Sequence, residues 1–376
     1  MPFVPKFSIT VRMASNLMRI ERANTLVDHL PLPATILKDL QKESRVQTVL
    51  LSTKIEGNRL SEAQKRAALY ARSRSAAEQE VANLLKAMEY LEECEERGLP
   101  VTEELIKRLH AIIRVIPSGR RPRLSEYRQV QNAVRDEADG RIVYMPPEWQ
   151  DVPRLMEDLV AWVNHPLTHE LPVPIQAGVF LYQFLTIHPY LDGNGRTGRA
   201  LATYLMRRGG LGLKRLFVLE TYYDRNLAAY YENLQMGLHH NYYFGRHEAD
   251  LTGWLEFFLQ GVAEVFAEAA RIVESKSQEF LAVEPDLLRG LDGVQRAVFA
   301  HLALRNDMAT TTDLRRLTGL ADRTIRDRIK KWIHEGFLTP ADPHAKRIRT
   351  VKLACRYEKL AQQVRTDAER YKYLLR

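Results

Sequence analysis

The sequence predicts a mainly α-helical chain with one small β-hairpin and a separate, basic C-terminal module. Amphipathic stretches bounded by helix caps and stop signals run through most of residues 10–280. One stretch rich in Pro, Gly and Arg, residues 117–147, breaks that pattern and is typical of turns and short strands. The net charge of +8 lies in the last quarter, because residues 281–376 contain 20 Lys/Arg and 12 Asp/Glu whereas the rest contains 35 of each. A basic surface of this kind favours an anionic partner.

The composition is that of an ordinary globular protein, with 45% apolar and 27% charged residues. No run of about 18 apolar residues occurs, so we expect no membrane span. The first residues lack a basic segment followed by an apolar one, so we expect no signal peptide. Cys94 and Cys355 lie far apart without a zinc-binding spacing, which fits the reducing cytoplasm. We therefore predict a cytoplasmic location and no membrane partner.

Helices are expected through most of the first 115 residues. Pro31 and Pro33 separate the first two helices, and Gly57-Asn58 is a stop signal for the second near Glu56. Ser61, with Gln64 three residues later, forms a capping-box pattern that starts the third. Two more helices are expected over residues 76–97 and 102–116.

The next part, up to residue 280, is expected to hold the hairpin and a further set of helices. Residues 127–131 are extended in pattern, residues 138–141 have turn composition, and residues 142–145 form a short β-like run before two prolines. Leu216–Leu219 is a second stretch with strand character. Helical periodicity favours helices over residues 152–164, 173–187, 195–208, 225–239 and 248–280.

Residues 188–199, which read H-P-Y-L-D-G-N-G-R-T-G-R, concentrate groups that bind phosphate. A Gly193–Gly195 loop that leads into a helix presents backbone N–H groups and the positive end of the helix dipole to an anion. Asp192 is a hard oxygen ligand suited to Mg²⁺. Arg196 and Arg199 are three residues apart, so they share a helix face from which both can reach phosphate oxygens. His188 is the general-base candidate of the motif.

Two other nucleotide motifs share part of this string. Gly193, Gly195 and Gly198 also spell the G-x-G-x-x-G dinucleotide fingerprint, but that motif needs a strand running into its first glycine, and the preceding periodicity is helical. A Walker A loop needs Lys and Ser/Thr where this chain has Arg199 and Ala200. Both alternatives fit the residues less well than an anion hole flanked by a base and two arginines.

The stretch resembles the signature of Fic-domain proteins, H-x-F-x-D/E-G-N-G-R-x-x-R, with Tyr190 in place of the usual Phe. Fic proteins typically transfer AMP from ATP to a hydroxyl side chain of a target protein. The resemblance implies a Fic-type helical bundle with a β-hairpin flap over residues 116–280. It also implies ATP as substrate, Mg²⁺ as cofactor, and protein adenylyltransferase activity with release of pyrophosphate and possible self-modification. The resemblance also implies a homodimer, because such proteins commonly form dimers. The sequence does not identify the target protein.

The resemblance implies a role for each matching residue. His188 would deprotonate a target Ser, Thr or Tyr, whose oxygen would attack the α-phosphate, and Asp192 would hold Mg²⁺. The hairpin at Arg141–Tyr144 resembles the family's flap, which would position the target by strand addition and border the nucleotide. Tyr230-Tyr231 resembles a tyrosine pair near the adenine. The implied ATP contacts are Glu56, Arg141, Ile142, Val143, Tyr144, Gly193, Asn194, Gly195, Arg196, Thr197, Gly198, Arg199 and Tyr230. Transfer of UMP or another phosphorylated group is an alternative, because the base pocket lies outside the motif.

A second motif lies upstream, within residues 1–115. Ser52, Glu56 and Gly57 match the family's inhibitory motif, S/T-x-x-x-E-G/N, in which the glutamate pairs with the second arginine of the signature. Here that arginine is Arg199. The carboxylate and a phosphate would compete for one guanidinium, so the resemblance implies an autoinhibited enzyme whose inhibitory helix precedes the signature.

Residues 285–376 resemble a winged-helix domain. Helices are expected over residues 294–304, 312–318 and 322–334, followed by two strands at residues 337–339 and 348–353 around a turn at 341–346. Winged helices bind DNA or dock proteins, so an alternative function is a nucleotide-sensing DNA-binding regulator. The cations expected to face such a partner are Arg323, Arg326, Arg328, Lys330 and Lys331.

Overall fold

The computed structural model divides the chain into two compact units and describes most of it. The first unit comprises Met1–Leu30 and Asp39–Glu274, and the second Pro31–Lys38 and Ser275–Arg376. The described residues are 3–32, 34–71, 74–115, 123–135, 140–283, 286–304, 307–342 and 348–366. None of the helices in these ranges is both long and apolar enough to cross a bilayer.

The N-terminal helices form where the caps and stop signals predict them. Ser61 and Gln64 make a reciprocal capping box, as predicted, and Gly57, with φ of 81°, ends the second helix. The fifth helix ends at Ile113, three residues before the predicted end. The bounds are α1 Val11–His29, α2 Ala34–Ile55, α3 Glu62–Ala68, α4 Ala76–Glu96 and α5 Glu103–Ile113.

The predicted hairpin is present but begins later than expected. Strand β1, Val134–Arg135, pairs antiparallel with β2, Ile142–Tyr144, so that Val134 lies opposite Tyr144. Residues 127–131 are irregular instead of extended in a strand, because the Arg128 backbone N–H is already bonded to the Pro189 carbonyl at 2.9 Å. Of the predicted turn at 138–141, residues 138 and 139 lie outside the described part of the chain, as do residues 116–122.

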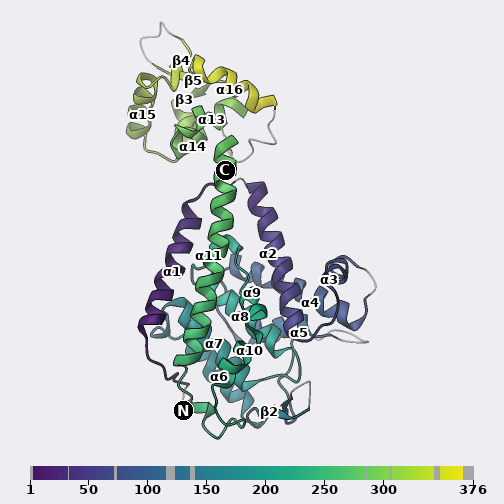
Figure 1. The fold of residues 1–376 in the computed structure, drawn as a ribbon. Helices are drawn as coiled ribbons and strands as arrows, with labels where there is room; N and C mark the ends of the chain where they lie inside the picture. The colour runs from purple at the N-terminus through teal and green to yellow at the C-terminus, as the bar shows by residue number, and fades with distance from the viewer. Residues whose placement is uncertain are drawn as a thin grey trace. The chain divides into compact units, whose positions relative to one another are not determined.

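The helices around the signature build the core of the first unit (Figure 1). α7 is buried over most of its length, and Gly198 of α8 packs closely against it. A Cβ added at Gly198 would lie only 3.0 Å from Phe184 and 3.1 Å from Leu181, so a larger residue would not fit without a shift. The predicted strand Leu216–Leu219 is wrong, since these residues form a loop whose leucines are buried. The bounds are α6 Val152–Val163, α7 Val173–Ile187, α8 Asn194–Arg208, α9 Glu220–Arg225, α10 Leu227–Gln235 and α11 Thr252–Val283.

The second unit contains the order of helices and strands expected of residues 294–353. A three-stranded antiparallel sheet, in the order β3-β5-β4, packs with the helices on buried side chains that include Phe299, Trp332 and Phe337. Residues 343–346 of the expected turn, and residue 347 after it, lie outside the described part, and α12, β3 and α16 were not expected. The bounds are α12 Asp286–Arg289, α13 Gly293–Leu304, β3 Ala309–Thr310, α14 Thr311–Thr318, α15 Asp322–His334, β4 Leu338–Pro340, β5 Thr350–Leu353 and α16 Cys355–Thr366.

Candidate active site

His188 stands at the C-terminal end of α7 in a left-handed backbone conformation. Its φ is 52°, which is uncommon for a residue with a Cβ and occurs often at functional sites. Arg128 stabilises the conformation, because its Nε donates a hydrogen bond to the His188 carbonyl at 3.0 Å. The His188 Nδ1 lies 3.3 Å from the Leu185 carbonyl, so this bond places the proton on Nδ1 and leaves Nε2 as an acceptor. Burial lowers the pKa of His188 to about 4, so the ring is neutral at pH 7.

The loop after His188 forms the N-terminal end of α8. Gly193 caps the helix with φ of 81°, and a Cβ at this position would lie 3.3 Å from the Nε2 of His110. The Asn194 side chain is bound to the backbone of Tyr190, whose N–H and carbonyl lie 2.9 and 2.8 Å from it. The side chain therefore shapes the loop, and the backbone N–H groups of the first helical turn are the groups suited to bind an anion.

Arg199 is held by Ser52 and Glu56, the residues expected to form an inhibitory motif. Its NH1 lies 2.9 Å from Glu56 Oε1, its Nε donates to Ser52 Oγ at 3.0 Å, and its NH2 donates to the Ser52 carbonyl at 3.0 Å. Arg199 is buried, and burial alone would lower its pKa, but the charge of Glu56 raises the pKa above its ordinary value. A Cβ added at Gly195 would overlap the Glu56 carboxylate, so this carboxylate lies directly against the first turn of α8.

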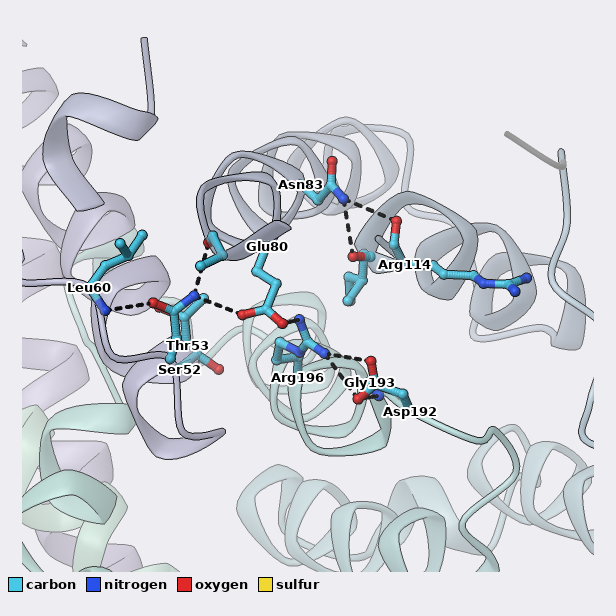
Figure 2. A network of polar contacts seen from close by, with 12 residues as sticks. Ser52, Thr53, Leu60, Glu80, Asn83, Arg114, Asp192, Gly193 and Arg196 are labelled. Carbon is cyan, nitrogen blue, oxygen red and sulfur yellow. Dashed lines mark hydrogen bonds and ion pairs between the residues drawn. The ribbon is translucent and has the colours of Figure 1, made fainter. Parts of the chain in front are cut away.

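Arg196 lies in a second network of charges on the same helix (Figure 2). Its side chain is 3% exposed, its NH2 lies 3.2 Å from both Asp192 oxygens, and its NH1 lies 3.6 Å from Glu80 Oε1. Within the described part of the chain, the Nε and NH1 atoms of this buried guanidinium have no hydrogen-bond partner. A buried cation in this condition is suited to an incoming anion.

Asp192 meets the requirements of a magnesium ligand that works together with a substrate. Its side chain is 80% exposed, and its Oδ1 also accepts the Gly193 N–H at 2.7 Å. The described residues contain no cluster of three or more His, Cys, Asp or Glu that would form a closed metal site. Mg²⁺ commonly binds one or two carboxylates together with water and substrate phosphates, and this donor set fits that mode.

A cleft of about 210 Å³ opens beside these groups. Tyr230 is buried in its wall with its ring 4.5 Å from that of Tyr223, and the half-exposed Tyr231 donates a hydrogen bond to the Ile55 carbonyl at 3.3 Å. Aromatic and apolar walls next to a cationic end are suited to a planar base that carries phosphates. The expected site residues that line the cleft are Glu56, Val143, Tyr144, His188, Gly195, Arg199 and Tyr230.

Other expected contacts lie away from this cleft. Thr197 is fully buried, and Gly198 packs on α7, so both serve the packing of α8. Arg141 and Ile142 lie on the flap, where Arg141 is exposed and Ile142 is half-buried. Gly57 forms the turn that ends α2.

Two residues that position the signature loop, His110 and Arg128, were not predicted from the sequence. His110 stacks on Tyr190 with centroids 3.5 Å apart and rings 4° from parallel. Its Nε2 lies 2.9 Å from the Asp192 carbonyl and its Nδ1 2.7 Å from Ser125 Oγ, while burial lowers its pKa to about 4. Arg128 is buried and donates to carbonyls of His188, Val130 and Pro147. Arg128 lies in an irregular segment, where no periodic pattern predicts burial. His110 lies in the predicted helix at 102–116, but nothing in that helical pattern indicates its contact with the signature loop.

The fold and the site together define the class of domain. Residues 100–206 match the Fic/DOC family, and this part of the chain is a Fic domain. Solved structures share the fold: a Fic family protein from Desulfovibrio desulfuricans G20 covers 94% of this chain with a TM-score of 0.59 and 21% identity, and this chain covers 99% of it. A Fic domain containing signaling protein from Bacteroides thetaiotaomicron covers 70%, is itself covered to 97%, and has a TM-score of 0.58 and 20% identity.

The curated relatives carry the name of an enzyme. The protein adenylyltransferase Fic of Drosophila grimshawi is 31% identical over 179 residues, which are 46% of this chain and 35% of that protein. The protein of the same name from Drosophila willistoni is 31% identical over 179 residues, 46% of this chain and 34% of its own. The chain therefore spans about a third of the length of these relatives.

Proposed function

We propose that the chain is an autoinhibited protein adenylyltransferase that transfers AMP from ATP to a Ser, Thr or Tyr hydroxyl of a target protein. The observation that carries the proposal is the position of Glu56, whose carboxylate contacts both Arg199 and the first turn of α8. An anion-binding turn, a neutral histidine and two buried arginines form a phosphoryl-transfer site, and a carboxylate stands where a phosphate oxygen would bind. The names of the relatives support the same chemistry.

The transfer would proceed in line at the α-phosphate. The Nε2 of His188 would take the proton of the acceptor hydroxyl, whose oxygen forms a bond to phosphorus while the bond from the α-phosphorus to the bridging oxygen breaks. Pyrophosphate leaves with that bonding pair. The N–H groups at the start of α8 would stabilise charge on the α-phosphate, and Arg196 and Arg199 that on the leaving group. Mg²⁺, held by Asp192, would neutralise charge on the phosphates.

Autoinhibition follows from competition for Arg199. While Glu56 and Ser52 hold this guanidinium, it is unavailable to the terminal phosphate, and ATP would bind without the geometry for transfer. A preference of about 2.8 kcal/mol for the Glu56-bound state would leave roughly 1% of the molecules competent.

Labelling of protein by ATP radiolabelled at the α-phosphate tests the proposal. We expect Mg²⁺-dependent labelling that increases in Glu56→Gly and is lost in Glu56→Gly with His188→Ala. Mass spectrometry of Glu56→Gly protein incubated with mixed nucleotides and a cell lysate identifies the transferred group and separates AMP from UMP or phosphocholine. A Glu56→Gly protein that binds ATP but labels neither itself nor any lysate protein would refute the transferase proposal.

A second candidate function concerns the second unit, for which we propose a winged helix that binds double-stranded DNA. A cleft of about 1050 Å³ lies along the exposed face of α15. Arg323, Arg326 and Lys330 of α15 line it together with Arg349, which precedes β5. Cations on an exposed helix beside a wing match the phosphate-binding face of helix-turn-helix proteins.

Mobility shifts with random duplex DNA test this second function. We expect Arg323→Ala with Lys330→Ala to weaken binding and to reduce its salt dependence, because each lost phosphate contact lowers the slope by about 0.9. Lys359→Ala on α16 is the matched control, since it removes an exposed cation of the same unit outside the cleft. Equal binding by the double variant and the control would contradict a DNA-binding role for α15.

A further inference from the structure

Glu80 of α4 lies between the signature helix and the loop that follows the inhibitory motif (Figure 2). Its Oε1 is 3.6 Å from NH1 of Arg196, and its Oε2 accepts a hydrogen bond from Asn58 Nδ2 at 2.7 Å. The two oxygens of one carboxylate therefore bind two different parts of the site, and neither contact belongs to the Glu56–Arg199 pair.

Asn58 fixes the end of the inhibitory segment. It lies two residues after Glu56 and is mostly buried, with its Nδ2 also donating to the Ala77 carbonyl at 2.9 Å and its Oδ1 accepting the Leu60 N–H at 3.2 Å. Its backbone N–H donates to the Thr53 carbonyl at 3.1 Å. The turn that carries Glu56 is thus attached to α4 through the Asn58 side chain.

We propose that Glu80 is a positioning residue that orients Arg196 for phosphate and, through Asn58, holds the loop that places Glu56. The inference rests on the proposed function, because it assigns Arg196 to the phosphates of ATP. It extends control of the site to a carboxylate outside both the signature and the inhibitory motif.

The ion pair with Glu80 matters most for the orientation of Arg196 when substrate binds. In the structure the guanidinium contacts Asp192 and Glu80. When Asp192 turns to Mg²⁺, Glu80 is the carboxylate that still contacts this buried cation among the described residues. One anion on NH1 then fixes the plane of the guanidinium, so its remaining N–H groups face the phosphates. Arg196 is in the first turn of α8, one turn nearer the anion hole than Arg199, so we assign it to the β-phosphate.

Nucleotide affinities test the contact with Arg196. Calorimetry would compare ATP, ADP and AMP on full-length Glu56→Gly with and without Glu80→Gln, a change that keeps shape and removes charge. We expect ATP and ADP to bind about tenfold more weakly and AMP to bind equally well, because AMP lacks the β-phosphate. Glu93→Gln, which changes an exposed glutamate of the same helix, is the matched control and should alter none of the three. Equal weakening of AMP, or no weakening of ADP, would overturn the assignment.

Hydrogen exchange and labelling test the contact with Asn58. In the otherwise unaltered chain, we expect Asn58→Ala and Glu80→Gln to speed amide exchange over residues 52–58, and Asn58→Ala to raise AMP labelling about tenfold. In the Glu56→Gly background, Asn58→Ala should leave labelling unchanged. Unaltered exchange, or an Asn58→Ala chain that labels no faster than its parent while Glu56→Gly labels well, would overturn this part.

These readouts separate the inference from the proposed function. If Glu56→Gly transfers no AMP, the transferase proposal fails, while the ADP and AMP affinities and the exchange rates still decide the role of Glu80. Thermal unfolding of each variant shows whether it is folded, and Glu80→Gln, which preserves the size of the side chain, is the variant from which the affinities are judged.

Discussion

Removing the Ser52 hydroxyl should partly release the inhibition. In the structure the hydroxyl accepts a hydrogen bond from Arg199 Nε at 3.0 Å, and the guanidinium is 2% exposed. Ser52→Ala leaves this charged donor buried without its acceptor while Glu56 and the Ser52 carbonyl stay in place. Hydrogen bonds to charged groups contribute about 1.5–3 kcal/mol, so the Glu56-bound state should lose at least about 1.5 kcal/mol relative to the phosphate-bound state.

That loss corresponds to about a tenfold increase in the competent population. We therefore expect Ser52→Ala to raise AMP labelling about tenfold, and Glu56→Gly to raise it further. Initial rates of labelling at saturating MgATP measure both. Thr53→Val is the matched control, because the Thr53 hydroxyl is buried on the same helix but bonds to the carbonyls of Val49 and Leu50. Labelling by Ser52→Ala at the level of the parent chain, beside an active Glu56→Gly, would refute the competition for Arg199.

Three further results are expected. The labelling rate of Glu56→Gly should stay level from about pH 8 to 6 and fall with an apparent pKa of about 4. Burial lowers the pKa of His188 from 6.5, so the neutral base is lost only when the pH drops through the lowered value. A labelling rate that falls with an apparent pKa near 6.5 would contradict this expectation. Phe184→Ala should reduce the free energy of unfolding by about 3–5 kcal/mol in denaturant titrations, since this ring of α7 is fully buried and packs against Gly198 of α8. A loss below about 1 kcal/mol would refute that packing. Chelation of Mg²⁺ should abolish labelling without lowering the melting temperature of the nucleotide-free protein, because Asp192 forms no closed metal site with other described residues; a lower melting temperature would contradict this interpretation.

The helices and the signature were predictable from sequence because each depends on local chemistry. Caps such as Ser61 with Gln64, and the stop at Gly57, fix helix ends within a few residues. The ion pair between Glu56 and Arg199 was expected from the resemblance of two short motifs, and it is present.

Other features depend on contacts between distant residues and leave no local pattern. The run Leu216–Leu219 has strand-like composition, yet it is a buried loop, because burial and strand formation give the same apolar signal. Glu80, His110 and Arg128 act on the signature from other elements, and a charge or imidazole in a helical pattern does not reveal its partner. Asn194 matched the signature, but only the structure shows its side chain bound to Tyr190.

We propose that this site transfers AMP and that Glu56 restrains it. Mass spectrometry of the Glu56→Gly chain, incubated with MgATP and a cell lysate, tests the claim most directly, with the unaltered chain and Glu56→Gly with His188→Ala alongside. We predict an adenylyl group on a Ser, Thr or Tyr of the enzyme or of a lysate protein, abundant with Glu56→Gly, scarce with the unaltered chain and absent with the double variant. An ATP-binding Glu56→Gly chain that yields no adenylylated residue would contradict the claim.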